Sequence, residues 1–284
     1  MTPKSLMTVS ECRELVESWR LENLQVSLVP TMGALHQGHL SLVKKAKELG
    51  DKVIVSIFVN PTQFGPSEDF ARYPRNLAKD FSLLEGVGVD AVFSPTANEM
   101  YGPDFQTWVS NDGITDILCG QSRPGHFRGV CTVVIKLMNM TSAQYCLFGK
   151  KDYQQFKIIA NMVRDLNIKT QVVACDIMRS DTGLALSSRN QLLSESELEI
   201  APNIFFALST LLQTFSNGCH LVETLVDGFK NQLAEFEAIK LEYIEVRRER
   251  DLAEISGEIE EYAIVFVAAK LGAVRLIDNI ELRL

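Results

Sequence analysis

Apolar residues along the first half of the chain alternate between strand-like runs and helix-like periods. The run Val53–Val59 is rich in β-branched residues and lacks a polar face, which predicts a parallel strand buried on both sides. Val26–Val29 is a shorter run of the same kind. Between them, apolar residues from Leu40 to Leu49 recur at helical spacing, and Gly50 can end that helix. These segments predict a β–α–β unit with parallel strands and a right-handed crossover.

The same alternation continues to about residue 175. Near the start, Thr8 and Glu11 have the spacing of a capping box and predict a helix there. Further strands are expected at Asp90–Phe93, Tyr145–Phe148 and Lys169–Ala174, and further helices at Val130–Met140 and from Phe156 to Leu166. This alternation predicts an α/β fold with a Rossmann-like, doubly wound parallel sheet.

The pattern changes after about residue 180. Two long helices are expected at Glu195–Phe215 and Leu221–Phe236, followed by shorter strands at Leu241–Val246, Ala263–Ala269 and Val274–Ile277. This order predicts a smaller α+β domain after the first. We therefore expect two domains, residues 1–177 and 178–284.

Composition and charge exclude some classes of function. The net charge of −8 disfavours binding of a nucleic-acid backbone over a broad surface, although a local basic pocket can still hold a small phosphate ligand. We find no run of about 18 apolar residues, so no membrane-spanning segment is expected, and the start of the chain lacks an apolar signal core. The six cysteines form no C-x-x-C pair and have mostly apolar neighbours, which indicates free thiols in a reducing cytoplasm.

The pair His36-x-x-His39 is the first candidate for chemistry. It lies in a glycine-containing segment between a predicted strand and a predicted helix, at the edge of the sheet where α/β folds bind ligands. A helix N-terminus favours phosphate, and two imidazoles there can donate hydrogen bonds to a phosphoryl oxygen. Two alternatives stay open: ordinary local hydrogen bonds at a helix start, and a zinc site, which lacks an evident third ligand.

Four other polar segments could contribute to such a site. Phe148–Asp152 offers Lys151 for a phosphate, or it is a solvated charge cluster in which Asp152 caps a helix. Two hydroxyls and a guanidinium in Ser187–Arg189 suit phosphate oxygens, although such sequences are common on surfaces. The amides of Asn60–Phe64 suit a small polar substrate, or this segment is a proline-led turn. Arg123–Gly129 offers anion contacts, or it is a structured loop.

The order and spacing of several motifs resemble the pantoate–β-alanine ligase family, part of the larger HxGH nucleotidyltransferase group. The matching segments are VPTMGALHQGHLSLV (29–43), SIFVNPTQFG (56–65), YPRNLAKD (73–80), SRPGHFRGV (122–130), FGKKDYQQ (148–155), LALSSRN (184–190) and LIDN (276–279). The resemblance runs nearly from end to end.

This resemblance implies a two-step, ATP-dependent reaction. Pantoate would attack the α-phosphorus of ATP, giving pantoyl-adenylate and pyrophosphate, and β-alanine would then displace AMP to give pantothenate. Mg²⁺ would accompany the ATP. The N-terminal domain would carry the site, the smaller domain would act as a lid, and the protein would be a cytoplasmic homodimer.

The resemblance also implies roles for individual residues. His36, His39 and Lys151 would be catalytic. The residues implied for ATP are Met32, Gly33, His36, His39, Gly149, Lys151, Asp152, Met178, Leu186, Ser187, Ser188 and Arg189. The residues implied for pantoate are Pro30, Met32, Asn60, Gln63 and Gln155. Asp80 matches a position linked to Mg²⁺, and Arg123 and Tyr73 would contribute from the rim of the site.

The sequence departs from the family pattern at three places. Thr62 stands where Met or Leu is common, Lys150 stands where Glu is common, and residues 142–144 lack the usual Pro-Asp. The first two put substrate affinity in question, not the type of reaction. Two rival functions stay open: a nucleotidyltransferase that makes a dinucleotide or a CDP-alcohol, and a non-catalytic nucleotide-binding protein.

Overall fold

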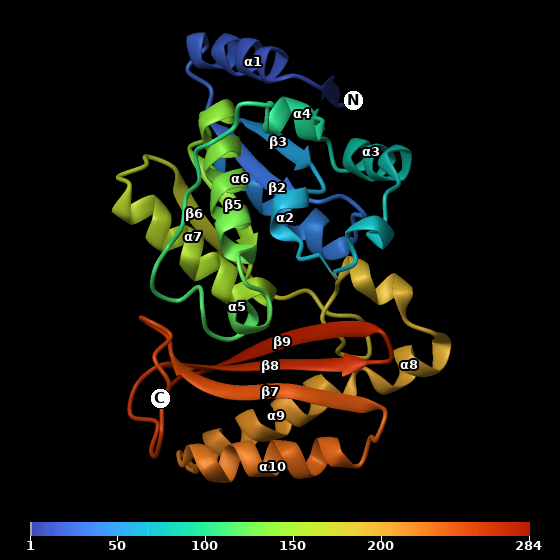
Figure 1. Cartoon of the computed structure of the whole chain (residues 1–284), viewed down its shortest axis with the longest axis vertical. Coiled ribbons are helices and arrows are strands. Elements are labelled where there is room, and N and C mark those ends of the chain that lie inside the picture. The colour runs from blue at the N-terminus through green and yellow to red at the C-terminus, as the bar shows by residue number, and fades with distance from the viewer. Residues whose placement is uncertain (1, 67) are drawn as a thin grey trace. The chain divides into compact units, whose positions relative to one another are not determined.

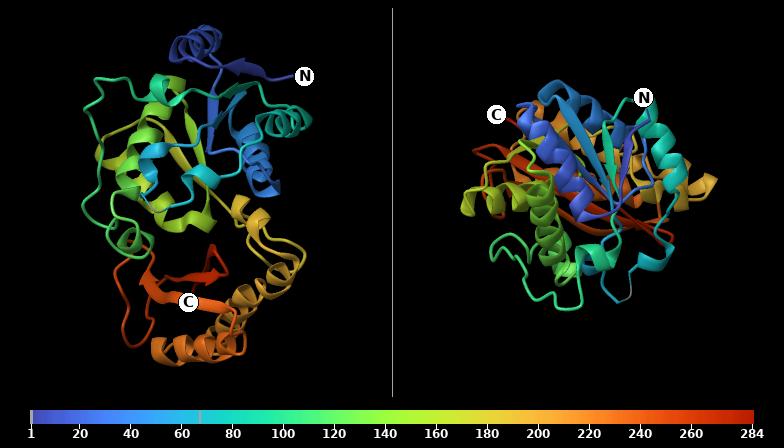
Figure 2. Two further views of the ribbon diagram at one scale, coloured as in Figure 1. Left: turned by 45° about the vertical axis from the view of Figure 1, so that its right-hand side comes forward. Right: turned by 90° about the horizontal axis from the view of Figure 1, so that it is seen from above.

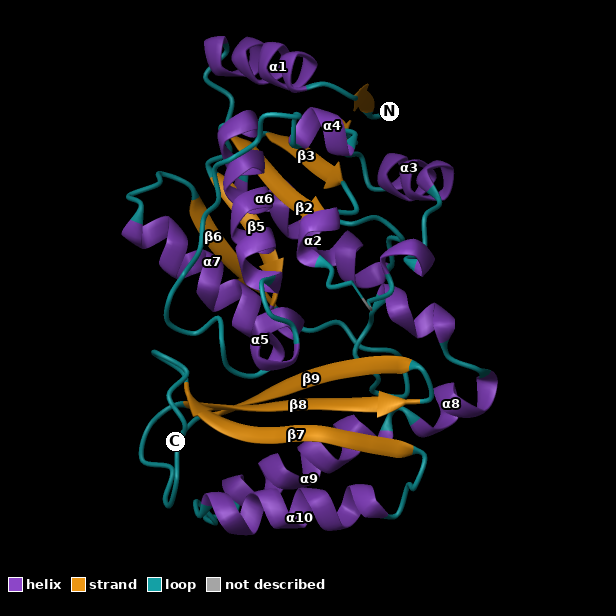
Figure 3. Ribbon diagram, viewed as in Figure 1, coloured by secondary structure: helices purple, strands orange, loops and turns teal. Residues whose placement is uncertain are grey.

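The structure is a computed structural model, and it describes residues 2–66 and 68–284 (Figure 1). The chain divides into two compact units. The first unit ends at Asp176, and the second runs from Ile177 to Leu284. The sequence-based boundary lies one residue further along, between residues 177 and 178. Each unit contains its own sheet (Figure 3).

The described part of the first unit contains a parallel sheet in the order β1-β4-β3-β2-β5-β6. Its strands are β1 (Lys4–Leu6), β2 (Val26–Thr31), β3 (Lys52–Ile57), β4 (Ala91–Phe93), β5 (Tyr145–Gly149) and β6 (Gln171–Cys175). All the strand pairs are parallel. The predicted Rossmann-like sheet is therefore confirmed. The edge strand β1 was not expected, because three residues are too few to show a period.

Helices connect these strands and cover the sheet (Figure 2). They are α1 (Val9–Leu21), α2 (Gln37–Leu49), α3 (Leu77–Gly86), α4 (Ala97–Met100), α5 (Cys119–Ser122), α6 (His126–Thr141) and α7 (Tyr153–Asp165). Short 3₁₀ turns are η1 (Pro61–Gln63), η2 (Phe70–Arg72) and η3 (Lys150–Asp152). Thr8 and Glu11 form the predicted capping box at the start of α1.

The central strands are buried on both faces. Alternate residues point to opposite sides of a sheet. Val29, Val55 and Val92 lie in a cluster with apolar residues of α2 and α3. Their neighbours Leu28 and Ile54, which point to the other face, are also fully buried. The continuous β-branched run of β3 thus has the environment that it predicts for a central parallel strand.

Gly50 ends α2, as predicted, but not in the left-handed conformation that favours glycine. Its φ is −123°, which any residue can adopt. The need for glycine comes from close packing instead, because a Cβ at this position would lie 2.5 Å from Ser27 Oγ and 3.1 Å from Gln25 O. The helix end is therefore held tightly against the start of β2.

The second unit, which the structure describes throughout, is an antiparallel sheet packed on helices. Its strands are β7 (Ile239–Arg248), β8 (Ala263–Leu271) and β9 (Val274–Leu282), and its helical segments are η4 (Ser188–Leu192), α8 (Glu195–Ile200), α9 (Asn203–Ser216) and α10 (Val222–Ala234). Buried residues of α9 and α10, including Leu208, Leu211 and Phe229, share one apolar cluster with the sheet. The predicted α+β character is confirmed.

The predicted helix Glu195–Phe215 is divided into α8 and α9. Pro202 stands at the division, where proline removes a backbone donor. By length and composition alone, the segment Glu195–Ser216 could cross a membrane. However, Leu208, Leu211 and Phe215 of α9 lie in the apolar cluster of this unit. These contacts account for the apolar residues on the buried face of α9.

We predict that Gly50→Ala destabilises the first unit by about 1–3 kcal/mol, the usual cost of overpacking a tight site. The added methyl group would lie 2.5 Å from Ser27 Oγ. Gly86→Ala is the matched control, because nothing lies within 4 Å of a Cβ there. Urea unfolding of both variants measures the difference, and equal midpoints would contradict the packing explanation.

Candidate active site

Three predicted polar segments follow neighbouring strands of the first sheet. Strand β2 pairs with β3 on one side and with β5 on the other. Because the strands are parallel, their carboxyl ends lie at the same edge. Residues 32–39 follow β2, residues 60–63 follow β3, and residues 149–152 follow or end β5. The sheet therefore brings these three segments to the edge where open α/β sheets bind ligands.

The segment after β2 begins with a tight turn. Thr31 Oγ1 donates to Ser56 O at 2.7 Å and accepts from Gly33 N at 3.1 Å. Gly33 and Ala34 both have positive φ, +79° and +50°. Glycine adopts this region readily, but alanine does so at a cost. The turn therefore needs stabilising contacts from outside itself.

Asp80 of α3 supplies those contacts. This buried carboxylate accepts from Leu35 N through Oδ1 at 2.8 Å and from Ala34 N through Oδ2 at 3.0 Å. Burial raises the pKa of Asp80, while the two backbone donors act in the opposite direction. A Cβ at Gly33 would lie only 2.9 Å from Asp80 Oδ2, so glycine is also needed for this approach. Both oxygens are thus engaged with the protein backbone.

His36 and His39 cap helix α2 reciprocally. His36 Nδ1 accepts from Gly38 N at 3.1 Å, and His39 Nδ1 accepts from His36 N at 3.3 Å. An Nδ1 atom that accepts carries no proton, so in a neutral ring the proton lies on Nε2. The ring centroids are 4.1 Å apart. Ordinary local hydrogen bonds at the helix start, one of the predicted alternatives, therefore form at Nδ1 of both rings. Each Nε2–H stays available as a donor.

Burial keeps both rings neutral. It lowers the pKa of His36 to about 4, with a further contribution from the charge of Lys151. It lowers the pKa of His39 to about 3, aided by His36 and then by Lys151. The positive charge of Lys151 thus contributes to the lowered pKa of both rings. Near pH 7 the site therefore combines one lysine cation with two uncharged donors.

The segment at the end of β5 starts with Gly149, the last residue of the strand, and continues through η3. Lys151 Nζ lies 3.5 Å from Asp152 Oδ2, and the Lys151 side chain is largely buried. In the next helix, Gln154 is buried and holds the chain from Ile114 to Cys119 through three hydrogen bonds. Gln155 is only half-buried. The two adjacent glutamines thus differ in environment, and of the two only Gln155 is partly exposed.

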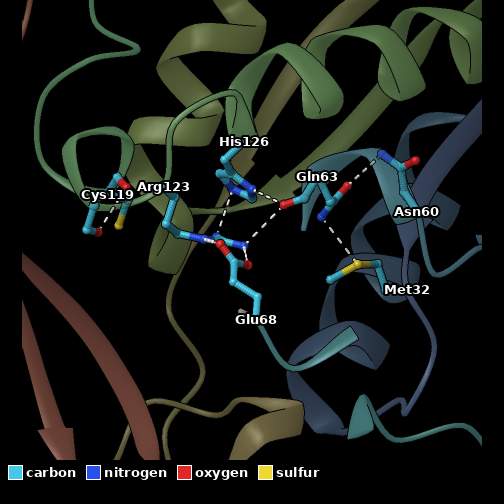
Figure 4. A network of polar contacts seen from close by, with 8 residues as sticks. Met32, Asn60, Gln63, Glu68, Cys119, Arg123 and His126 are labelled. Atoms are coloured by element: carbon cyan, nitrogen blue, oxygen red, sulfur yellow. Dashed lines mark hydrogen bonds and ion pairs between the residues drawn. The ribbon is translucent and has the colours of Figure 1, made fainter. Parts of the chain in front are cut away.

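The segment after β3 carries Asn60 and Gln63, both buried. Asn60 Nδ2 donates to Gln63 Oε1 at 3.0 Å, and Gln63 Nε2 points at Met32 Sδ at 3.3 Å (Figure 4). Thioether sulfur is a weak acceptor. The Gln63 amide nitrogen can therefore exchange this contact for a better acceptor on a ligand. Pro30, which lies in β2 opposite Ser56, belongs to the same sheet edge.

A second network holds the main chain at Gln63. His126 Nδ1 lies 2.8 Å from Gln63 O, and Arg123 Nη1 lies 3.0 Å from His126 Nε2 (Figure 4). Because a carbonyl only accepts, Nδ1 of His126 is the donor, and Nε2 accepts from the guanidinium. Arg123 also pairs with Glu68, with Nε 2.9 Å from Oε1. Burial, with the Arg123 charge, lowers the pKa of His126 to about 4. The basic segment 123–129 therefore holds the main-chain carbonyl of Gln63 in place.

The predicted ATP-binding residues from Met178 to Arg189 lie in the second unit. Leu186 N donates to Met178 O at 2.9 Å, and Ser187 Oγ accepts from Arg189 N at 3.3 Å at the start of η4. Ser188 is buried. Arg179 fixes this segment to β9, because its guanidinium donates to both oxygens of Asp278 at 2.6 and 2.9 Å. The LIDN motif thus acts through the buried Asp278 as an anchor.

Several residues that shape the site have no sequence pattern that predicts them. Glu68, Tyr101 and Arg179 act through contacts with residues far along the chain, so neither period nor spacing marks them. For Arg179, the sequence offers only the match of LIDN to the family, because that motif contains its partner Asp278. Across residues 2–66 and 68–284, no group of three His, Cys, Asp or Glu side chains is arranged to hold a metal ion. The predicted Mg²⁺ contact of Asp80 therefore has no cluster of protein ligands around it.

Comparisons with known proteins agree with this geometry. The family model for pantoate–β-alanine ligase matches residues 4–281. A pantothenate synthetase of Thermotoga petrophila is 45% identical over 276 residues, which cover 97% of this chain and 98% of the relative. The pantothenate synthetase of Thermotoga neapolitana is 46% identical over 272 residues, which cover 96% of this chain and 97% of the relative.

Solved structures give the same result. A pantothenate synthetase from Thermus thermophilus matches with a TM-score of 0.93 and 38% identity, covering 99% of this chain and 100% of the other. A pantoate–β-alanine ligase from Francisella tularensis, crystallised with β-γ ATP and β-alanine, matches with a TM-score of 0.81 and 36% identity, covering 98% and 97%. Since the family model spans nearly the whole sequence and the fold agrees, the chain belongs to the pantoate–β-alanine ligase family.

Proposed function

We propose that this protein condenses pantoate with β-alanine at the expense of ATP, giving pantothenate, AMP and pyrophosphate. The observation that carries the proposal is the reciprocal cap of His36 and His39. It leaves two neutral Nε2–H donors at the start of α2, on the sheet edge to which the segments with Lys151 and Gln63 also belong. Family membership supplies the substrates, because related proteins carry the names of this activity.

In the first step, a pantoate carboxylate oxygen attacks the α-phosphorus of ATP. The bond from that phosphorus to the bridging oxygen breaks, and pyrophosphate leaves with pantoyl-adenylate behind. Such a step needs positioned donors around the phosphoryl oxygens and little covalent chemistry from the protein. The Nε2–H groups of His36 and His39 supply these donors, and Lys151 supplies the positive charge.

In the second step, the β-alanine amine attacks the acyl carbon of the adenylate. The carbon–oxygen bond to AMP breaks, and the nitrogen loses a proton as the amide forms. Gln63 and Gln155 would hold the pantoyl group, with Pro30 and Met32 lining its pocket. Gly149 and Asp152 would lie against the ribose. These assignments combine the family resemblance with the placement of all six residues at one sheet edge.

We assign Asp80 a positioning role in place of the predicted Mg²⁺ contact. Its two oxygens accept from Ala34 and Leu35, and it is buried. Magnesium usually keeps several waters and binds mainly through substrate phosphates, so the reaction does not require a dedicated protein cage. Mg²⁺ remains part of the proposal as the ion that accompanies ATP.

Residues of the second unit complete the proposal. Met178, Leu186, Ser187, Ser188 and Arg189 would bind ATP, with the last three contacting the triphosphate. The structural support for these residues comes from within the second unit, because the Arg179–Asp278 ion pair holds the segment that leads to Leu186 and the residues after it. Closure of the second unit as a lid, assembly as a homodimer and a cytoplasmic location stay predictions of the family resemblance.

Product analysis tests the activity directly. With ATP, Mg²⁺ and pantoate, the protein should release pyrophosphate and retain the adenylate, and AMP should appear in quantity only when β-alanine is added. Chromatography of the nucleotides together with a pyrophosphate assay measures both. A dinucleotide or CDP-alcohol product would favour the rival nucleotidyltransferase, and the absence of pantoate-dependent pyrophosphate would refute the proposal.

The two nitrogens of His39 can be tested separately. His39→Asn keeps a side-chain acceptor for His36 N but removes the Nε2–H donor, so it should fold normally and lose about 10²-fold in rate. His39→Ala should lose the same rate and also about 0.5–2 kcal/mol of stability, because the cap is lost. Initial rates and thermal unfolding separate these effects. An unchanged rate in His39→Asn would remove this donor from the mechanism.

Asp80→Asn distinguishes a positioning role from a metal-binding role. The amide cannot accept from both backbone N–H groups, so the variant should lose about 1–3 kcal/mol of stability and show a reduced kcat. Its half-saturating Mg²⁺ concentration should match that of the wild type. Glu85→Gln, an equal charge change on the exposed face of α3, is the control. A large increase in the Mg²⁺ requirement would restore Asp80 as a metal contact.

A further inference from the structure

Asn60 has no polar group left for a substrate. It is 1% exposed. Its Oδ1 accepts from Tyr101 Oη at 2.9 Å, from Thr62 Oγ1 at 2.9 Å and from Thr62 N at 3.3 Å. Its Nδ2 donates to Gln63 Oε1 at 3.0 Å and to Gly129 O at 3.3 Å. An amide nitrogen has two hydrogens, and both are used within the protein.

The contacts of Asn60 also fix the direction of its amide. The carbonyl of Gly129 can only accept, so the atom that faces it must be the nitrogen. The N–H of Thr62 can only donate, so the atom that faces it must be the oxygen. Gly129 lies close because it has no side chain: a Cβ there would be 2.4 Å from Thr62 O. The packing of α6 on η1 therefore determines which end of Asn60 points toward Gln63.

This direction passes on to Gln63. Because Asn60 presents a donor, Gln63 turns its oxygen toward Asn60 and its nitrogen toward Met32 Sδ (Figure 4). The hydrogen bonds from Tyr101 through Asn60 to Gln63 form a chain in which each residue donates to the next. A reversed Gln63 amide would offer an acceptor to the ligand and would repel a carboxylate or carbonyl oxygen.

We propose that Asn60 is a positioning residue for the reaction. It sets the orientation of the Gln63 amide, which in turn contacts pantoate. The hydroxyls of Tyr101 and Thr62 hold Asn60 in place. This inference rests on the proposed function, in which Gln63 contacts pantoate. It replaces the direct pantoate contact that the family resemblance implies for Asn60.

Two hydroxyl groups share the task of holding the Asn60 oxygen. Here the two hydroxyl oxygens of Thr62 and Tyr101 lie 3.3 Å apart and converge on one oxygen of Asn60. Loss of one hydroxyl leaves the other in place, so the full effect requires both to be removed.

The test removes the hydroxyls and keeps the shapes. Thr62→Val and Tyr101→Phe are nearly isosteric, and together they should raise the KM for pantoate by about 3- to 10-fold, the range of one or two neutral hydrogen bonds. The KM for ATP and kcat should change by less than about 2-fold, since the phosphate contacts are untouched. Tyr145→Phe, at the opposite end of β5, is the control and should change none of these values.

The same two substitutions in a Gln63→Ala background decide whether Asn60 acts through Gln63. If it does, they should cause no further increase in the pantoate KM, because the amide that they orient is gone. An increase of equal size in that background, or no increase in the wild-type background, would overturn the inference while leaving the ligase activity intact. A wild-type protein that does not use pantoate would overturn both proposals.

Discussion

The arrangement of the site depends on one buried carboxylate. Asp80 accepts from the backbone of Ala34 and Leu35, in a turn where Gly33 and Ala34 both have positive φ. Without that acceptor, two buried N–H groups would have no partner, at a cost of about 1–3 kcal/mol each. The turn determines where α2 begins, and hence where His36 and His39 lie. A residue on α3 thereby fixes the N-terminal end of another helix, α2.

Throughout the site, one physical rule separates the residues that position other residues from those that could face a ligand. A buried amide must satisfy its donors and acceptors. Gln154 and Asn60 do so within the protein, so they stabilise loops and neighbours. Among the described residues, Gln63 meets only a thioether at its amide nitrogen, which is a poor partner for a buried donor. Residues of one chemical type, close in sequence, therefore have different roles because their surroundings differ.

The fold could be predicted from the sequence more fully than the site. Long apolar runs such as Val53–Val59 and periodic segments such as α6 have patterns that tertiary packing reinforces, and they occur as expected. The division at Pro202 was not foreseen, because the apolar period continues across it. Glycine at position 50 ends its helix as predicted, but for a steric reason that only the neighbouring Ser27 reveals.

The candidate segments were likewise identified from the sequence, but not the roles within them. Spacing after strands brings residues 32–39, 60–63 and 149–152 to one edge, because parallel strands require it. Whether a side chain there faces a ligand or the protein depends on partners such as Tyr101 and Asp80, which lie 41 and 46 residues away from the groups that they bind.

Neutral donors also make the site compatible with an acidic protein. Protonated imidazoles would repel Lys151 and require compensating carboxylates, whereas buried neutral rings would hold a phosphate, as proposed, through hydrogen bonds that salt screens only weakly.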